Sequence, residues 1–162
     1  MNIEIICIGN LKESYLRDAE REYAKRLTPY CKVKIVELRE SRLPADAGDA
    51  EEERVRRLES EALLAAAEKS GNAGYVLALD ARGKQQSSEK FADTIQNLAI
   101  GGKSTLIFII GGSLGLSDSV REKANAVISF SEMTFPHQLM RVILLEQIYR
   151  AYKIMRGEPY HK

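Results

Sequence analysis

Residues 105–116 read TLIFIIGGSLGL, and this stretch decides the fold. Its β-branched and aromatic residues make Thr105–Ile110 the most strongly strand-like segment of the chain. The glycine-rich segment Gly111–Leu116 then predicts a turn at the carboxyl end of that strand. Further strands are predicted on both sides of it. Together the predicted strands are Asn2–Ile8, Cys31–Leu38, Tyr75–Leu79, Thr105–Ile110 and Ala126–Phe130.

Helical patterns separate these strands. Tyr15, Ala19 and Tyr23 recur at helical spacing in a helix that stops before Pro29, and a long amphipathic helix is predicted from His137 to about Arg156. The other predicted helices run from Asp49 to about Lys69, from Ser88 to Gly101 and from Ser117 to about Asn125. Alternating strands and helices favour parallel pairing, because parallel strands need crossover connections. The sequence therefore predicts one α/β domain over residues 1–162, a three-layer sandwich with a mostly parallel sheet.

Two local features of the helix after Asp49 are predicted as well. Asp49 and Glu52 have the spacing of a capping pair at its start. Its apolar stripe is assigned to Val55, Leu58, Ala62 and Ala65 or Ala66. Ser88 is the predicted cap of the following helix.

Composition excludes several classes of protein. The formal net charge of +1 gives no broad electrostatic attraction to nucleic acid, although basic side chains gather near the end of the chain. Two cysteines and two histidines supply neither a disulfide framework nor a local zinc site, so a reducing cytoplasm and no metal are expected. No apolar run approaches the roughly 20 residues that cross a bilayer, and no membrane association is expected.

Ligands of parallel α/β sheets bind beyond the carboxyl ends of the strands. This rule selects three segments, Asp80–Gln85, Gly111–Leu116 and Ser131–Pro136. Taken alone, Gly111–Leu116 is about as well explained by a tight turn as by a ligand loop. Residues 101–105 resemble the end of a phosphate-binding loop, but they close a helix and open a strand, so a helix cap and turn is the better interpretation.

Both histidines have a plain structural interpretation. His137, at the start of the last helix, is interpreted as a packing or capping residue. Composition favours a frayed tail around His161, while Tyr160, His161 and Lys162 together also offer stacking, hydrogen bonding and charge for RNA.

Four stretches resemble the RlmH family of SPOUT methyltransferases, the large-subunit ribosomal RNA pseudouridine methyltransferases. They are residues 8–12 (IGNLK), 108–116 (FIIGGSLGL), 129–141 (SFSEMTFPHQLMR) and 149–162 (YRAYKIMRGEPYHK). The resemblance covers essentially the whole chain, and residues 39–73 carry little of it. It implies a deep C-terminal trefoil knot, a rare exception to the rule against threaded chains.

The resemblance also implies bound S-adenosylmethionine (SAM), a homodimer, and methylation of N3 of a pseudouridine in helix 69 of the 23S ribosomal RNA in the ribosome. The family's ligand contacts fall on Leu79, Gly111 and the run from Phe130 to Phe135. Leu79, Leu116, Met133 and Phe135 suit an adenine slot, and Gly111 and Gly112 are expected to leave space for the ribose and sulfonium. The expected cofactor residues are Leu79, Gly111, Gly112, Leu116, Phe130, Ser131, Glu132, Met133, Thr134 and Phe135.

The last helix is the expected interface of the homodimer. It carries more apolar surface than one core-facing stripe needs. The residues assigned to this interface are Leu139, Val142, Ile143, Ile148 and Ala151.

On the substrate side, the expected RNA contacts are Arg141, Tyr160, His161 and Lys162. His161 is the candidate for deprotonating N3 or for gripping the RNA. Two other functions stay open: a SPOUT methyltransferase acting on another RNA position, and a non-enzymatic RNA-binding module of the ribosome whose glycine turns are purely structural.

Overall fold

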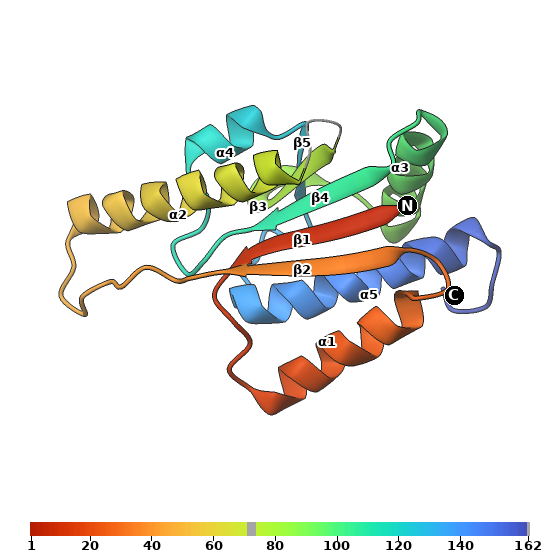
Figure 1. The fold of residues 1–162 in the computed structure, drawn as a ribbon, viewed down its shortest axis with the longest axis horizontal. Coiled ribbons are helices and arrows are strands. Elements are labelled where there is room, and N and C mark those ends of the chain that lie inside the picture. Colours follow the sequence, from red (N-terminus) through yellow and green to blue (C-terminus); the bar gives the residue numbers. More distant parts are fainter. Residues whose placement is uncertain (71–73, 162) are drawn as a thin grey trace.

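The computed structural model describes residues 1–70 and 74–161, which form a five-stranded sheet in the order β2-β1-β4-β3-β5 (Figure 1). Every neighbouring pair of strands is parallel. The strands are β1 (Asn2–Ile8), β2 (Lys32–Leu38), β3 (Tyr75–Gln85), β4 (Thr105–Ile110) and β5 (Ala126–Ser129). The prediction of an α/β fold with a parallel sheet is confirmed.

Helices cover both faces of this sheet. They are α1 (Ser14–Leu27), α2 (Asp49–Lys69), α3 (Ser88–Ile100), α4 (Asp118–Lys123) and α5 (His137–Met155). Figure 1 shows α2 and α4 above the sheet and α1 and α5 below it. The helix α3 packs against α5, and its Phe91 and Ile95 belong to the same core as Leu144 of α5. The three-layer arrangement follows the prediction. No helix in the described part of the chain combines the length and the apolar character that a membrane crossing requires.

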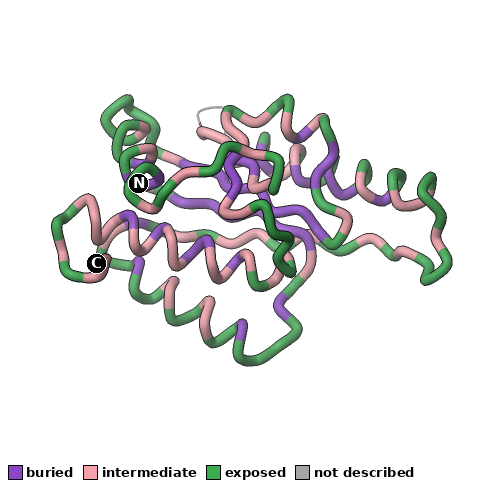
Figure 2. The backbone as a smooth tube through the Cα atoms, turned by 180° about the vertical axis from the view of Figure 1, so that it is seen from behind, coloured by how far each residue is buried: buried purple, intermediate pink, exposed green. Residues whose placement is uncertain are grey.

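The strand β4 shows why the sheet is covered on both sides. Leu106 and Phe108 point to one face of the sheet and pack in the core formed with α1, α3 and α5. Ile107 and Ile109 point to the other face and pack in the core formed with α2 and α4. Successive side chains of a strand point to opposite faces, so an apolar run without polar alternation requires two apolar layers. In Figure 2 the buried residues accordingly gather along the central strands and the inner faces of the helices.

The segment Asp80–Gln85 differs from the prediction of a plain loop. The strand β3 continues to Gln85, and both Leu79 and Lys84 lie opposite Ile128 of β5 because the register shifts between them. The intervening residues therefore arch out of the sheet beside the end of β5. Gly83 makes this arch possible, since a Cβ there would lie 2.6 Å from the carbonyl carbon of Ile128.

We expect Gly83→Ala to lower the free energy of unfolding by about 2 to 3 kcal/mol, because the added methyl group overlaps the Ile128 backbone. Urea unfolding followed by circular dichroism measures the loss. Gly48→Ala is the matched control, since no atom lies within 4 Å of a Cβ at Gly48. Equal losses in the two variants would contradict the close approach at Gly83.

The helix α2 also departs from the sequence prediction. Gly48 occupies its cap position without a side-chain hydrogen bond, so Asp49 and Glu52 do not form the expected capping pair. Of the predicted stripe, Val55 is buried, whereas Leu58 is 41% exposed and Ala62 and Ala65 are exposed. The rest of the buried face carries Leu63 and Ala67 together with the polar residues Glu59 and Ser60. The stripe was misplaced because the true buried face includes side chains that sequence patterns assign to solvent. At α3 the cap is Ser87, which accepts from the Lys90 N–H, not Ser88.

Candidate active site

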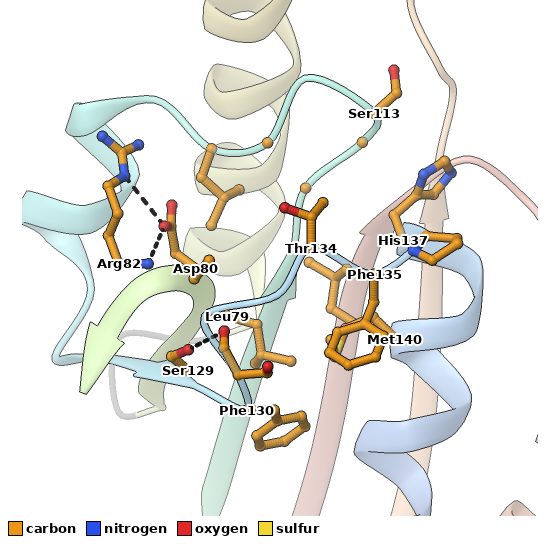
Figure 3. A pocket seen from close by; sticks show the side chains of 18 of the residues that line it. Leu79, Asp80, Arg82, Ser113, Ser129, Phe130, Thr134, Phe135, His137 and Met140 are labelled. Atoms are coloured by element: carbon orange, nitrogen blue, oxygen red, sulfur yellow. Dashed lines mark hydrogen bonds and ion pairs between the residues drawn. The ribbon is translucent and has the colours of Figure 1, made fainter. Parts of the chain in front are cut away.

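A cavity of about 840 Å³ opens at the carboxyl ends of β3, β4 and β5 (Figure 3). Three segments border it: residues 79–82, residues 110–116 and residues 128–137. Met140 of α5 and Arg56 of α2 complete its lining. All three segments selected by the strand-end rule thus contribute residues to one cavity.

The expected cofactor residues gather at this cavity, with one difference. Leu79, Gly111, Gly112, Leu116, Phe130, Ser131, Met133, Thr134 and Phe135 all line it, and Glu132 does not. Sequence reasoning missed Arg56 as a lining residue, and it left Asp80 and Arg82 out of the expected cofactor residues although the strand-end rule had selected their segment. Asp80 and Arg82 carried a usable signal, because charged residues directly follow the apolar run of β3. Arg56 carried none, since it comes from a helix far away in sequence.

The glycine loop, residues 111–116, has a different reason for its glycines than the one expected. A Cβ on Gly111 would lie 2.9 Å from the carbonyl carbon of Gly115, and a Cβ on Gly112 would lie 2.7 Å from Oε2 of Glu59. Gly115 has a φ of +75° and donates its N–H to the Gly112 carbonyl at 3.0 Å. The missing side chains therefore let the loop close on itself and pack against α2. The space they leave is filled by the protein.

The segment from Ser131 to Pro136 is shaped by a serine turn. The Ser129 hydroxyl donates to the Ser131 carbonyl at 2.8 Å, and the Met133 N–H donates to Oγ of Ser131 at 2.9 Å. Met133 is 74% exposed and Phe135 is 36% exposed, so two large apolar side chains stand at the mouth of the cavity. Exposed apolar groups at a cavity mouth are typical of a surface that a ligand or partner covers.

The Asp80 side chain connects the arch of β3 to the helix α4. Its carboxylate accepts from the Arg82 N–H at 2.9 Å and from Nη1 of Arg121 at 2.7 Å. Burial of the Asp80 carboxyl disfavours its ionisation, but these donors hold its pKa below the ordinary value. Arg121 also donates to the Leu116 carbonyl at 2.7 Å. The carboxylate is therefore ionised and links two of the cavity segments through α4.

His137 lies at the rim of the cavity, at the first position of α5 (Figure 3). Pro136 occupies the cap position and no side chain caps the helix, so capping by His137 is excluded. Its Nε2 is buried with no hydrogen-bond partner among the described residues. Burial lowers the pKa of the imidazole, which is therefore neutral at pH 7.

The tail of the chain is docked rather than frayed. The Tyr160 hydroxyl donates to Glu146 at 3.0 Å, and its ring lies 4.9 Å from that of Tyr149. His161 reaches Glu89 through Nε2 at 2.8 Å and Arg150 through Nδ1 at 3.3 Å. Lys162 lies outside the described residues.

The contacts of His161 determine its tautomer. A guanidinium only donates, so Nδ1 accepts from Arg150 and the proton sits on Nε2, which donates to Glu89. The Glu89 carboxylate is held ionised, with a pKa lowered to about 2 by hydrogen bonds from the Ser87 side chain, its own backbone N–H and His161. Both ring nitrogens are thus occupied within this chain.

The tail and the cavity lie at opposite ends of α5. The cavity borders His137 and Met140, whereas Tyr160 and His161 contact Glu146 and Arg150. At about 1.5 Å per residue, the positions 137 and 150 are roughly 20 Å apart along the helix. The cavity and the tail of one chain therefore do not form a common site.

Arg141 is not an RNA contact. Its side chain is 1% exposed, and its guanidinium donates to Glu20 at 3.0 Å, to Glu37 at 2.5 Å and to the Gly9 carbonyl at 2.9 Å. The prediction was wrong because these carboxylates, from α1 and β2, bury a charge that the sequence pattern assigned to solvent. Arg141 instead joins α5 to α1 and to the ends of β1 and β2.

Metal ligands do not gather in the part of the chain that the structure describes. Within residues 1–70 and 74–161, no three His, Cys, Asp or Glu side chains cluster in a way that could hold a metal ion.

Comparisons of this chain with known proteins identify its family. A family described as "Predicted SPOUT methyltransferase" matches residues 1–161. The ribosomal RNA large subunit methyltransferase H of Clostridium novyi (strain NT) is 55% identical over 162 residues, covering all of both chains. The protein of the same name from Bacillus pumilus (strain SAFR-032) is 50% identical over the same length, again covering all of both chains.

Solved structures resemble this chain in fold. A probable methyltransferase from Bordetella pertussis Tohama I has a TM-score of 0.57 at 11% identity, covering 92% of this chain and 95% of that one. A probable methylase family protein from Haemophilus influenzae Rd KW20 has a TM-score of 0.53 at 12% identity, covering 99% of this chain and 70% of that one. At such identities the likeness concerns the fold alone. The full-length match and the close relatives decide the family, and the chain belongs to the SPOUT methyltransferases, among relatives named ribosomal RNA large subunit methyltransferase H.

Proposed function

We propose that this chain is a SAM-dependent methyltransferase that modifies N3 of a pseudouridine in helix 69 of the 23S ribosomal RNA. The single observation that carries the proposal is the meeting of three strand-end segments around one cavity in a SPOUT family member. The names of the relatives supply the large-subunit RNA as substrate. The pseudouridine and its N3 atom come from the sequence resemblance. That residues 1–162 act as one domain in the cytoplasm is part of the proposal and rests on the length and the cysteine content of the chain.

The residues around the cavity fit SAM. Its volume of about 840 Å³ falls within the range of roughly 300–1,000 Å³ found for small-molecule sites. Leu79, Leu116 and Phe130 provide apolar surface for an adenine, and the backbone of residues 111–116 and 131–135 offers polar groups between them. This combination of apolar lining with a few polar groups is what an adenosyl group requires.

For methyl transfer the protein must mainly position the acceptor nitrogen and remove its proton. SAM supplies an already activated methyl group through its sulfonium, and no metal is needed for the transfer. The chain must hold the acceptor nitrogen in line and keep water out, which raises the effective concentration of the reacting groups. Met133 and Phe135 at the cavity mouth are placed to be covered by the RNA and to exclude water.

Removal of the N3 proton requires a base or an environment that favours the anion, because the imide proton is weakly acidic. His161 remains our candidate for this step or for gripping the RNA, with Tyr160 beside it. Within one chain His161 is far from the cavity, so the tail can serve only the cavity of a second subunit. We therefore propose a homodimer in which each tail completes the site of its partner.

The proposed dimer uses α5 and the start of α1. Leu139 is 37% exposed and Tyr15 is 67% exposed, and the bond from the Lys12 N–H to Gln138 at 3.3 Å brings the starts of the two helices together. Val142 and Ile143 are half-buried and extend this surface. Ile148 and Ala151 were wrongly assigned to the interface, because both are fully buried in the core of their own subunit.

We expect the protein to sediment as a dimer at assay concentration, because one subunit alone leaves the cavity without a tail. Leu139→Glu places a charge on the proposed interface, so it should shift the sedimentation coefficient to that of a monomer and abolish methylation. Glu122→Gln on the far side of the sheet is the control. An active monomer would contradict the composite site.

Family membership also supports a trefoil knot in the C-terminal part of the chain. In this proposal two of the three segments that border the cavity, residues 110–116 and 128–137, belong to the knotted region.

Two experiments separate this function from its alternatives. Calorimetry with SAM distinguishes the enzyme from an RNA-binding module, which should bind none. Transfer of labelled methyl groups to assembled ribosomes, compared with free 23S RNA, then tests the substrate. The near-neutral charge of the chain favours the ribosome, since broad phosphate attraction is weak. Labelling confined to free RNA, or mapped to another nucleotide, would contradict the proposed substrate.

A further inference from the structure

Two side chains of α2 form hydrogen bonds to the glycine loop and to the residue that follows it. Nε of Arg56 donates to the Leu114 carbonyl at 2.9 Å, and Oγ of Ser60 accepts from the Ser117 N–H at 3.0 Å. These bonds take up one carbonyl near the tip of the loop and one N–H just after it. Both partners lie about 57 residues away in sequence, in the part of the chain with the least family resemblance.

The polar face of α2 is buried at these contacts. Ser60 is 0% exposed and Glu59 is 4% exposed. Oε1 of Glu59 accepts from the Ser41 N–H at 2.8 Å, and Oε2 fills the place where a Cβ of Gly112 would lie. Burial raises the pKa of the Glu59 carboxyl. Burying a polar side chain lowers the stability of a protein unless the side chain finds a hydrogen-bond partner. Ser60 and Glu59 find theirs in the residue after the glycine loop and in Ser41.

At the end of the loop, Arg121 of α4 donates to the Leu116 carbonyl at 2.7 Å and the Leu116 side chain is buried, so the contacts from α2 fix the part of the loop before it. Within residues 112–116, the backbone bond between Gly112 and Gly115 closes a single turn. Gly115 adopts a positive φ, and glycine carries a large conformational entropy when it is free. A loop of this kind binds a ligand tightly only if its conformation is already fixed before binding.

We propose that Arg56 and Ser60 of α2 are positioning residues of the cofactor site, which fix the glycine loop in the conformation that accepts SAM. This inference rests on the proposed function for the identity of the ligand. In it Arg56 acts through its Nε–H donor to Leu114, and its positive charge is not required. Its ion pair with Glu53 orients the guanidinium.

Two substitutions of Arg56 separate the donor from the charge. Glutamine carries an N–H donor at the position of Nε without a charge, whereas methionine has a similar length and neither donor nor charge. We expect Arg56→Met to raise the Kd for S-adenosylhomocysteine and the KM for SAM about 10-fold, the effect of one lost hydrogen bond to the part-buried Leu114 carbonyl. The kcat at saturating SAM should stay within about 2-fold.

Arg56→Gln should keep the affinity within about 2-fold of the unsubstituted protein. Arg57→Met is the matched control, because Arg57 is the neighbouring arginine of α2 and its side chain is 65% exposed. Equal losses in Arg56→Met and Arg56→Gln would show that the charge matters and would overturn the proposal. Unchanged affinity in Arg56→Met would overturn it as well.

Amide hydrogen exchange in the ligand-free protein gives a second readout. Ser60→Ala removes the acceptor of the Ser117 N–H, so exchange should speed up at Ser117 and through residues 112–116, with the core strand β4 unchanged. Unchanged exchange there overturns the positioning role whether or not the cofactor binds. A protein that binds no S-adenosylhomocysteine but shows the faster exchange would instead contradict the proposed function and leave the role of α2 in shaping the loop established.

Discussion

Replacing Gly111 by valine abolishes SAM binding in our expectation, with affinity reduced by roughly 100-fold or more. Even the first carbon of the new side chain would lie 2.9 Å from the carbonyl carbon of Gly115 and 3.0 Å from Cδ2 of Leu116. The glycine loop must open to relieve this overlap, and its backbone then no longer borders the cavity in the same way. Calorimetric titration with SAM and S-adenosylhomocysteine measures the effect.

Gly48→Val is the control for Gly111→Val, because a Cβ at Gly48 meets nothing within 4 Å. Circular dichroism and thermal unfolding of both variants establish that each is folded. The buried strand β4 ends at Ile110, before the loop, whereas Leu116 at the end of the loop packs into the core with Ile107 and Ile109. Normal SAM affinity in a folded Gly111→Val protein would remove the assignment of the cofactor site.

Deleting residues 160–162 should abolish methylation of ribosomes while SAM binding and dimerisation persist. Tyr160 and His161 contact Glu146, Arg150 and Glu89 at the surface and contribute nothing to the buried core. Their loss therefore removes the substrate side of the site without unfolding the protein. Single-turnover methylation at saturating ribosome measures the loss. A truncated protein that methylates at the full rate would rule out any role of the tail.

Single substitutions of His161 then assign its role. A general base contributes roughly 10²- to 10⁴-fold to the rate, and its loss is not restored by more substrate. Glutamine can donate to Glu89 and accept from Arg150 as the imidazole does, but it has no basic nitrogen. If His161 is the base, His161→Gln and His161→Ala lose rate together across the pH range. If it only grips the RNA, His161→Ala is rescued by excess ribosome.

The sequence was sufficient for the sheet and for most of the cavity. The apolar run of β4 required a layer of helices on each face, and the order of strands and helices required parallel pairing. Because the carboxyl ends of parallel strands meet at one edge, three segments that lie far apart along the chain could be assigned to one site from the order of the elements alone.

What the sequence did not reveal depends on contacts between distant residues. Arg141 belongs to a buried ion pair with α1 and β2, and Arg56 reaches a carbonyl 58 residues away. A basic side chain in a sequence looks the same whether its partner is a buried carboxylate, a backbone carbonyl or a phosphate. The arch after Leu79 was likewise hidden, because only the position of Ile128 explains the glycine at 83.

Mass spectrometry of the 23S ribosomal RNA from cells that lack this protein tests the proposed activity most directly. We expect the pseudouridine of helix 69 to lack its N3 methyl group in those cells. Expression of the unsubstituted protein should restore the methyl group, and expression of the Gly111→Val variant should not. A methyl group that persists at N3 in the absence of this protein would contradict the proposed function.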